Sequence, residues 1–177
     1  MDEFLQSVEK RAYQMARFAT GNSDEALDLV QDTMLAFVRR YSDKAPEERR
    51  PLFFTILQNR IRDWYRRQSV RNRLSAWWFG SRGEEENSSA PDPISQIPDP
   101  AGRSPEEHWR SGRVGEAINR AIEQLPLRQQ QAFLLRAWEE LSVTDTARAM
   151  GCSEGSVKTH YSRAVQTLRE LLEEQGP

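Results

Sequence analysis

Apolar residues recur at intervals of three and four along most of the chain, and no run alternates with the period of two that a half-buried strand requires. This pattern predicts an all-α protein. A first helix is expected from about residue 3 to residue 18, and a second from about residue 24 to residue 40. Gly21 and the polar residues Asn22 and Ser23 lie between them and supply a C-cap and possible N-caps.

A third helix is predicted to begin near Pro51, because proline is tolerated in the first turn of a helix. Phe54, Leu57, Ile61 and Trp64 are spaced by three, four and three residues, so they share one face. Arginines occupy the flanks of that face. The helix is therefore expected to be strongly amphipathic.

Helical periodicity is lost between about residues 80 and 111, where five of the nine prolines are interleaved with glycine, serine and acidic residues. A segment this poor in apolar residues cannot offset its ordering entropy by burial, so we expect an extended linker. The predicted fold is two small helical domains, residues 1–76 and 113–177, joined by a flexible, acidic, proline-rich linker at 77–112. Trp77 and Trp78 at its entrance either pack back on the first domain or await a partner.

The second half of the chain is again helical, with segments expected at about 113–125 and 127–140. Ser142 and Asp145 stand three apart, a capping-box arrangement that opens a short helix. That helix is expected to stop at Gly151, and Ser153 can cap a last helix that reaches about residue 172.

The strongest local signal is a helix-turn-helix over about residues 143–165. Ala147 allows the two helices to approach, Gly151 suits a left-handed turn position, and Val157 anchors the second helix. Thr146 occupies a position where an aliphatic core residue is usual. The second helix would present short donors and cations suited to base edges and phosphates, namely Ser153, Glu154, Ser156, Lys158, Thr159, Ser162 and Arg163. A helical hairpin with an ordinary solvated face is the alternative.

The net charge is only −2, which by itself argues against a nucleic-acid binder. The charge is segregated, however, since six arginines lie from Arg60 to Arg73 against a single acid, Asp63. This run is either a solvated face or a surface that follows phosphates beside rings on which bases stack. Asn59 and Trp64, close to the arginines, favour the second interpretation.

Residues that could carry catalysis or hold a metal are sparse. His108 and His160 are distant in sequence, Cys152 is the only cysteine, and no glycine-rich phosphate loop follows a strand. We therefore expect no catalytic residue, no metal and no cofactor. No stretch approaches the roughly 18 apolar residues of a membrane span, and the first residues do not form an export signal, so a cytoplasmic protein without membrane insertion is expected.

Three stretches together carry a family resemblance. Residues 28–37 read DLVQDTMLAF, residues 52–67 contain an Asn, an Asp and paired arginines, and residues 125–135 read LPLRQQQAFLL ahead of the helix-turn-helix. In this order and spacing they resemble the extracytoplasmic-function sigma factors of bacterial RNA polymerase. The resemblance implies a core-polymerase-binding helix, a helix for melting and minus-10 recognition, and a minus-35-binding domain.

The resemblance also implies roles residue by residue. Core polymerase would contact Asp28, Leu29, Gln31, Asp32 and Leu35. The non-template strand of the minus-10 element, with bases extruded from the stack, would be held by Asn59, Arg60, Asp63, Trp64, Arg66 and Arg67. The minus-35 duplex would be bound by Arg128, Ser153, Glu154, Ser156, Lys158, Thr159, Ser162 and Arg163.

The partners that this resemblance implies are core RNA polymerase, promoter DNA and an anti-sigma factor, and the protein would be a non-catalytic specificity subunit. Two other functions are left open by the residues. A stand-alone helix-turn-helix regulator would bind duplex DNA without polymerase. A helical adaptor would use its charged faces only to dock other proteins.

Overall fold

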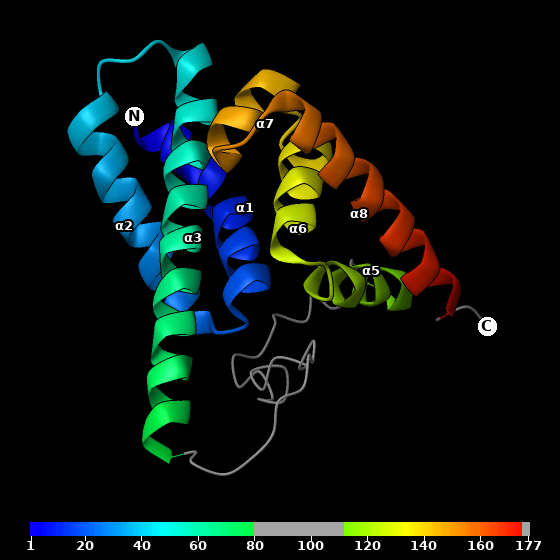
Figure 1. Cartoon of the computed structure of the whole chain (residues 1–177). Helices are drawn as coiled ribbons and strands as arrows, with labels where there is room; N and C mark the ends of the chain where they lie inside the picture. The colour runs from blue at the N-terminus through cyan, green and yellow to red at the C-terminus, as the bar shows by residue number, and fades with distance from the viewer. Residues whose placement is uncertain (80–111, 175–177) are drawn as a thin grey trace.

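The computed structural model describes residues 1–79 and 112–174, and every regular element in these two ranges is helical (Figure 1). The all-α prediction is confirmed. The elements are α1 Asp2–Thr20, α2 Ser23–Tyr41, α3 Pro46–Phe79, α5 Arg113–Glu123, α6 Leu127–Phe133, the π-helical turn η2 Leu134–Trp138, α7 Val143–Met150 and α8 Glu154–Glu174.

The boundary between α1 and α2 follows from local capping. Gly21 ends α1 in the left-handed conformation with φ 66°, which glycine adopts without steric cost. The side-chain oxygen of Asn22 then accepts hydrogen bonds from the backbone N–H groups of Asp24 and Glu25, at 2.9 and 3.0 Å. Two of the unpaired donors at the start of α2 are thereby satisfied, as the sequence predicted.

The third helix is longer than predicted at both ends. It begins at Pro46, which needs no donor in the first turn, and it continues through Pro51 at the loss of one backbone hydrogen bond. It continues as far as Phe79 because no glycine or proline interrupts the chain between Pro51 and Gly80. Residues 77–79, assigned to the linker, are therefore helical, and the linker prediction for residues 80–111 lies outside the described residues.

The capping predicted for the helix-turn-helix is confirmed. The Ser142 hydroxyl accepts a hydrogen bond from the Asp145 N–H at 3.0 Å, and the Ser153 hydroxyl accepts one from the Ser156 N–H at 3.1 Å. Gly151 ends α7 with φ 63°, in the left-handed region. These contacts set the turn that joins α7 to α8.

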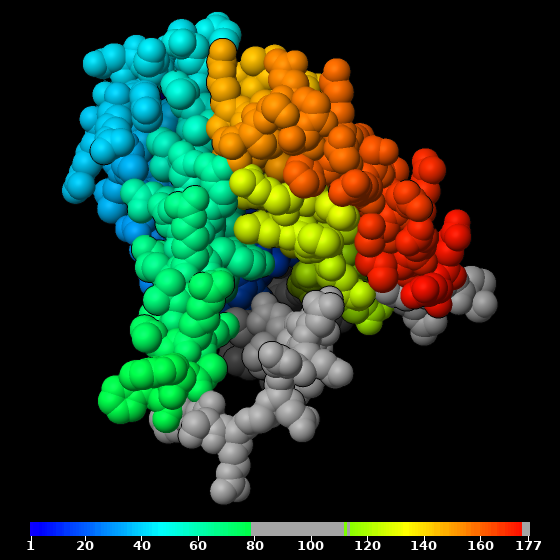
Figure 2. Space-filling model, in the orientation of Figure 1, coloured from blue at the N-terminus to red at the C-terminus, as the bar shows by residue number. Residues whose placement is uncertain are grey.

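The helices form two modules that pack against each other. The first module consists of α1, α2 and α3, and the second consists of α5 to α8. Figure 1 shows α3 between α2 and α7, and Figure 2 shows the second module directly against α3. The sequence left the arrangement of the two modules open, and the structure packs them directly against each other.

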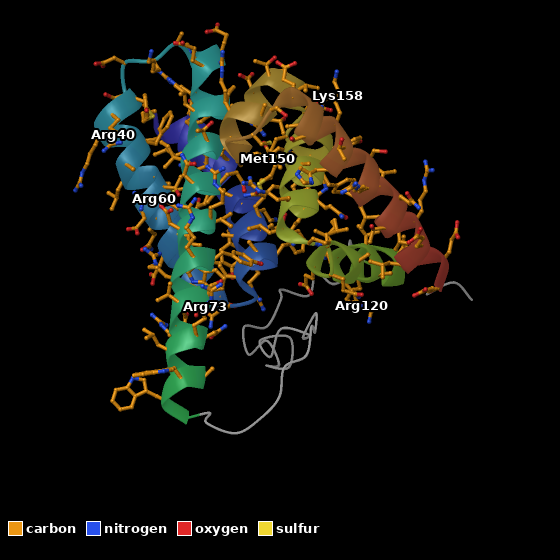
Figure 3. The ribbon with its side chains drawn as sticks, viewed as in Figure 1. Arg40, Arg60, Arg73, Arg120, Met150 and Lys158 are labelled. Atoms are coloured by element: carbon orange, nitrogen blue, oxygen red, sulfur yellow. The ribbon has the colours of Figure 1, made fainter. Side chains whose placement is uncertain are left out.

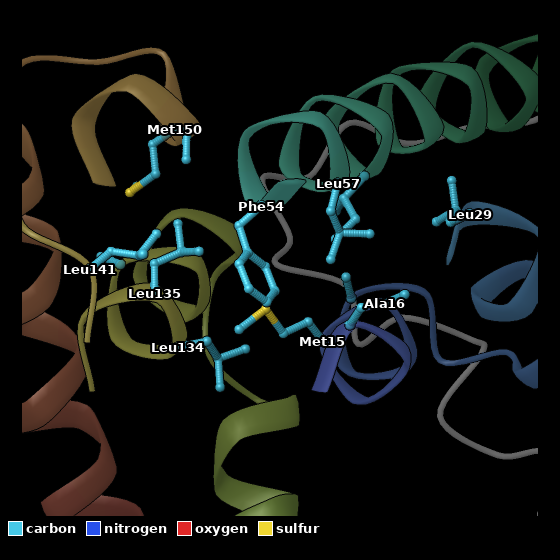
Figure 4. Packing of buried hydrophobic residues seen from close by; sticks show 14 of the residues in the cluster. Met15, Ala16, Leu29, Phe54, Leu57, Leu134, Leu135, Leu141 and Met150 are labelled. Carbon is cyan, nitrogen blue, oxygen red and sulfur yellow. The ribbon is translucent and has the colours of Figure 1, made fainter. Parts of the chain in front are cut away.

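One hydrophobic core continues through both modules. Figure 4 shows Met15 and Phe54 of the first module beside Leu134 and Leu135 of the second, and all four side chains are buried. An aromatic contact between Phe18 of α1 and Trp138 of η2, with ring centroids 5.6 Å apart, extends this packing. Burial of apolar area is the main favourable term in such an association.

Candidate nucleic-acid and polymerase interfaces

The arginine-rich side of α3 presents several predicted DNA-binding residues to solvent. Asn59, Asp63, Arg66 and Arg67 are exposed, and the Arg66 guanidinium lies 3.6 Å from the Asp63 carboxylate. This ion pair joins residues three apart on one helix and is well solvated, so it holds Arg66 only weakly. Phosphate or base edges can therefore compete for the guanidinium.

Trp64 does not belong to this exposed surface. Its side chain is 5% exposed, and its indole N–H donates a hydrogen bond to the Glu25 carboxylate at 3.1 Å. The prediction that this ring contacts DNA is corrected, because both its faces lie within the core and only its polar tip is satisfied at the edge. Its actual role is to join α3 to α2.

Arg60 also links α3 to α2 in this structure. Its guanidinium lies 3.6 Å from the Asp32 carboxylate, and its Nε is buried without a hydrogen-bond partner in the described residues. A residue predicted to bind DNA and a residue predicted to bind polymerase are thus paired with each other.

The recognition face of the helix-turn-helix lies on the outer side of α8. Lys158, Thr159, Ser162 and Arg163 are exposed, and they form two neighbouring pairs four residues apart, so they share a helical face. Figure 3 shows Lys158 on the side of α8 away from α3. This face brings two cations and two hydroxyl donors together, which suits phosphates and base edges in a major groove.

The remaining predicted minus-35 residues have structural contacts. Ser153 caps α8, and the Glu154 carboxylate accepts a hydrogen bond from the Thr144 hydroxyl at 2.8 Å. Ser156 is half-buried beside this cap, with its hydroxyl accepting from Ser153 at 2.9 Å. The half-buried Arg128 donates to the Met150 carbonyl at 2.5 Å. These four residues shape the turn.

His160 lies on α8 between the two pairs of residues that form the recognition face, and its imidazole binds a proton less readily than a free one. Burial lowers the pKa of His160 below its ordinary value of 6.5, and the positive charges of Arg128 and Arg163 lower it further.

The stacked rings of Phe133 and Tyr161, with centroids 6.3 Å apart, hold this part of α8 against α6.

All but one of the residues predicted to contact polymerase lie on the outward side of α2. Asp28, Gln31, Asp32 and Leu35 are exposed. Leu29 is only 5% exposed and packs in the core, so its assignment to the contact surface is corrected. The reason is helical geometry, because Leu29 belongs to the inward stripe of α2 together with Ala26, Val30, Thr33 and Phe37, all of which are buried.

Two apolar residues on this side of α2 were missed by the sequence reasoning. Leu27 and Val38 are exposed together with Leu35, and all three fall within an arc of about 80° around the helix at 100° per residue. The signal was present, since α2 carries more apolar residues than one buried stripe can hold. A second apolar stripe beside acidic residues indicates a surface that a protein partner covers.

Polar contacts across the boundary between the modules were also missed. The Glu139 carboxylate of the second module lies 2.5 Å from the Arg50 guanidinium and 3.6 Å from that of Arg11, both in the first module. Gln131 donates a side-chain hydrogen bond to Gln58 at 2.9 Å. We call these five residues the interface cluster. Nothing in their sequence spacing could have paired them, because they lie more than 70 positions apart in sequence across the boundary.

Arg62 of α3 also contacts the second module across this boundary. Its guanidinium donates to the Met150 carbonyl at the end of α7 and touches the turn at Gly151. Burial lowers the pKa of Arg62, and repulsion from Arg128 and Arg66 contributes. The arginine run of α3 is thus divided, with Arg62 holding the second module and Arg66 and Arg67 facing solvent.

Within the two described ranges, no group of three or more His, Cys, Asp or Glu side chains is placed to hold a metal ion. In the same ranges, no helix is long and apolar enough to cross a membrane.

Comparison with known proteins assigns the chain to a family. Residues 3–71 match the family model described as Sigma-70 region 2, and residues 115–168 match the one described as Sigma-70, region 4. The chain is also 30% identical over 173 residues to the ECF RNA polymerase sigma factor BldN of Streptomyces coelicolor, covering 97% of this chain and 58% of that protein. The chain belongs to the extracytoplasmic-function sigma factors.

Other relatives agree. This sigma factor is 27% identical over 172 residues to the RNA polymerase sigma-E factor of Streptomyces coelicolor, covering 97% of this chain and 85% of the relative. Its fold is similar to that of the sigma factor RpoE in complex with the anti-sigma factor NepR from Bartonella quintana, with a TM-score of 0.62, 24% identity and 98% of each chain covered. This sigma factor binds core RNA polymerase and directs it to promoters, as the resemblance implied.

Proposed function

We propose that this sigma factor acts in the cytoplasm as a non-catalytic subunit with three contact surfaces. The outward side of α2 binds core polymerase through Asp28, Gln31, Asp32 and Leu35. The α3 residues Asn59, Asp63, Arg66 and Arg67, with Arg60 once it leaves Asp32, hold the single-stranded minus-10 element. The outer face of α8 docks on the minus-35 duplex through Lys158, Thr159, Ser162 and Arg163.

The observation that carries this proposal is the α8 face on a capped helix-turn-helix. A helix whose start is fixed by Ser153 and whose inner side is held by Val157 has one orientation, so its exposed cations and hydroxyls keep a fixed spacing. Fixed donors are what direct readout of base edges requires. A helical adaptor would not need this arrangement.

Binding both promoter elements at once requires the two modules to separate. The elements are named for positions about 25 base pairs apart, which is about 85 Å of duplex at 3.4 Å per step. A compact chain of 177 residues has a radius of gyration of only about 16 Å. Fully extended, the 32 residues from 80 to 111 would span at most about 105 Å at about 3.3 Å per residue, which suffices for the separation.

Separation breaks the interface cluster and the contact of Arg62 with Met150. The packed arrangement is thus a form of the free sigma factor, and polymerase and DNA supply the free energy that opens it. The proposal also includes an anti-sigma factor for this chain, since the similar RpoE is found with NepR. The exposed apolar stripe of α2 offers such an inhibitor a surface that polymerase also needs.

In-vitro transcription with purified core polymerase on a pool of upstream DNA tests the function. Wild-type protein should redirect initiation to new start sites. The double variant Arg66→Ala/Arg67→Ala should lose promoter opening, whereas the control Arg169→Ala, a cation of α8 beyond the region 4 match, should not.

Two results would contradict the proposal. Tight duplex binding without polymerase, together with no redirected initiation, would indicate a stand-alone regulator. Unchanged promoter opening by the Arg66→Ala/Arg67→Ala variant, with loss of a protein partner, would indicate an adaptor.

A further inference from the structure

The last turns of α3 form a surface that the proposed function does not use. The region 2 match ends at residue 71, whereas α3 continues to Phe79. In Figure 1 this end of α3 extends past the ends of α1 and α2, and Figure 3 shows Arg73 on it. Residues 69–78 are all exposed.

Large apolar side chains gather on one side of this segment. Val70, Leu74, Trp77 and Trp78 fall within an arc of about 100° at 100° per residue, so they form a single stripe. Trp77 is 79% exposed and Trp78 is 76% exposed. Their rings meet edge to face, with centroids 6.3 Å apart and planes at 89°, so they are not stacked on each other and most of both ring surfaces stays exposed.

Arginines border this stripe on both sides. By the same helical geometry, Arg66 and Arg73 lie along one edge of the stripe and Arg71 along the other. No acidic residue occurs between Asp63 and Glu84 in the sequence. Within the described residues, the side chains of Arg71 and Arg73 take part in no ion pair. The surface is therefore both aromatic and strongly positive.

The opposite side of the segment is different in chemistry. It carries small or neutral polar residues, namely Gln68, Ser69, Asn72, Ser75 and Ala76. The positive charge and the rings are thus concentrated on one side. An anionic partner with flat apolar groups is complementary to that side, and a nucleic-acid strand with unpaired bases has both features.

We propose that this stripe binds single-stranded DNA, with Trp77 and Trp78 stacking on unpaired bases and Arg71 and Arg73 contacting phosphates. The inference rests on the proposed function and extends it along the same helix. The helix rises about 16 Å from Arg67 to Trp78, so a strand held at Arg67 runs on over the stripe. This continuity favours DNA over an anionic membrane, the other partner of a basic amphipathic helix.

Strand binding can be measured on the full chain without polymerase. The probe is a fluorescein-labelled oligothymidylate of about 20 nucleotides, because stacking tolerates any base. The variants are Trp77→Ala/Trp78→Ala and, as the matched control, Asn72→Ala on the opposite side of the same segment. Cosedimentation with vesicles of phosphatidylserine and phosphatidylcholine tests the membrane alternative, and far-UV circular dichroism checks folding.

The double tryptophan variant should bind the oligonucleotide at least about tenfold more weakly than wild type, and Asn72→Ala should bind as wild type does. Replacing Arg71 and Arg73 by alanine should lower the log-log salt slope by about 1.4. Binding of the tryptophan variant within about twofold of wild type would overturn the inference. The inference would also be overturned if the protein bound the vesicles through the two tryptophans but did not bind the oligonucleotide.

Failure of this inference is distinguishable from failure of the proposed function. Absence of core-dependent initiation by wild-type protein counts against the sigma-factor surfaces, whereas the difference in oligonucleotide binding between the tryptophan variant and wild type reports on the stripe alone. If wild type initiates transcription and the tryptophan variant matches it in both assays, only the stripe inference falls.

Discussion

Replacing Glu139 by glutamine tests whether the packed arrangement of the two modules limits activity. The Glu139 side chain has no exposed surface and lies 2.5 Å from Arg50 and 3.6 Å from Arg11. Glutamine keeps the size of the side chain but removes its charge. The two arginines of the first module then face the second module without an anion.

The expected loss is smaller than for a fully buried pair. Removing one partner of a buried ion pair costs about 3–5 kcal/mol. Here the arginine side chains are 35% and 50% exposed, so water replaces much of the lost interaction. We therefore expect the association of the modules to weaken by about 1–2 kcal/mol, which raises the population of the open form about tenfold.

Small-angle scattering and transcription report this change separately. Wild-type protein should give a radius of gyration near 16 Å, and Glu139→Gln should give a larger average. At limiting concentrations of the sigma factor, the variant should also produce more transcript with core polymerase than wild type, because less free energy is needed to separate its two modules. Glu48→Gln, which removes a carboxylate from an exposed pair with Lys44, is the control and should change neither quantity.

An unchanged radius of gyration and unchanged transcript yield for Glu139→Gln, alongside an equally unchanged Glu48→Gln control, would refute the reasoning. The carboxylate would then contribute nothing to the association of the modules.

Four further predictions concern single side chains. Thr146 is fully buried and its hydroxyl has no partner in the described residues, so Thr146→Val should raise the free energy of unfolding by about 1 kcal/mol in urea titrations. Thr33→Val should instead lower it by about 1 kcal/mol, because the equally buried Thr33 hydroxyl donates to the Leu29 carbonyl at 2.6 Å; equal effects of both changes would contradict this account. In NMR titrations the pKa of His160 should lie below 6.5, and it should rise when Arg163 is replaced by alanine. Because the imidazole of His160 binds a proton more readily in the unfolded chain than in the folded one, the free energy of unfolding should fall as the pH drops below about 6.5. Lys158→Ala should weaken binding to duplex DNA and reduce the log-log salt slope by about 0.9, and an unchanged slope would place Lys158 away from phosphate.

Most predictions that depended on neighbouring residues along the chain are confirmed, although α3 begins at Pro46 and not near Pro51. Gly21, Ser142 and Gly151 end or begin helices at the expected positions, since a cap acts on backbone groups two to four residues away. The inward stripe of Phe54, Leu57, Ile61 and Trp64 is also buried as its spacing predicted. Capping hydrogen bonds and helical periodicity involve residues close together in the sequence, so they can be predicted from the sequence alone.

The tertiary structure alone decided which surfaces are free. Periodicity indicated that Trp64 lies on an apolar face but not that its N–H is satisfied by Glu25, and it could not separate Arg62, which holds Met150, from the exposed Arg66. Likewise, no pattern joined Glu139 to Arg50. Such contacts connect residues far apart in the chain, and the free energy that selects them comes from packing two whole modules together, which short-range patterns do not encode.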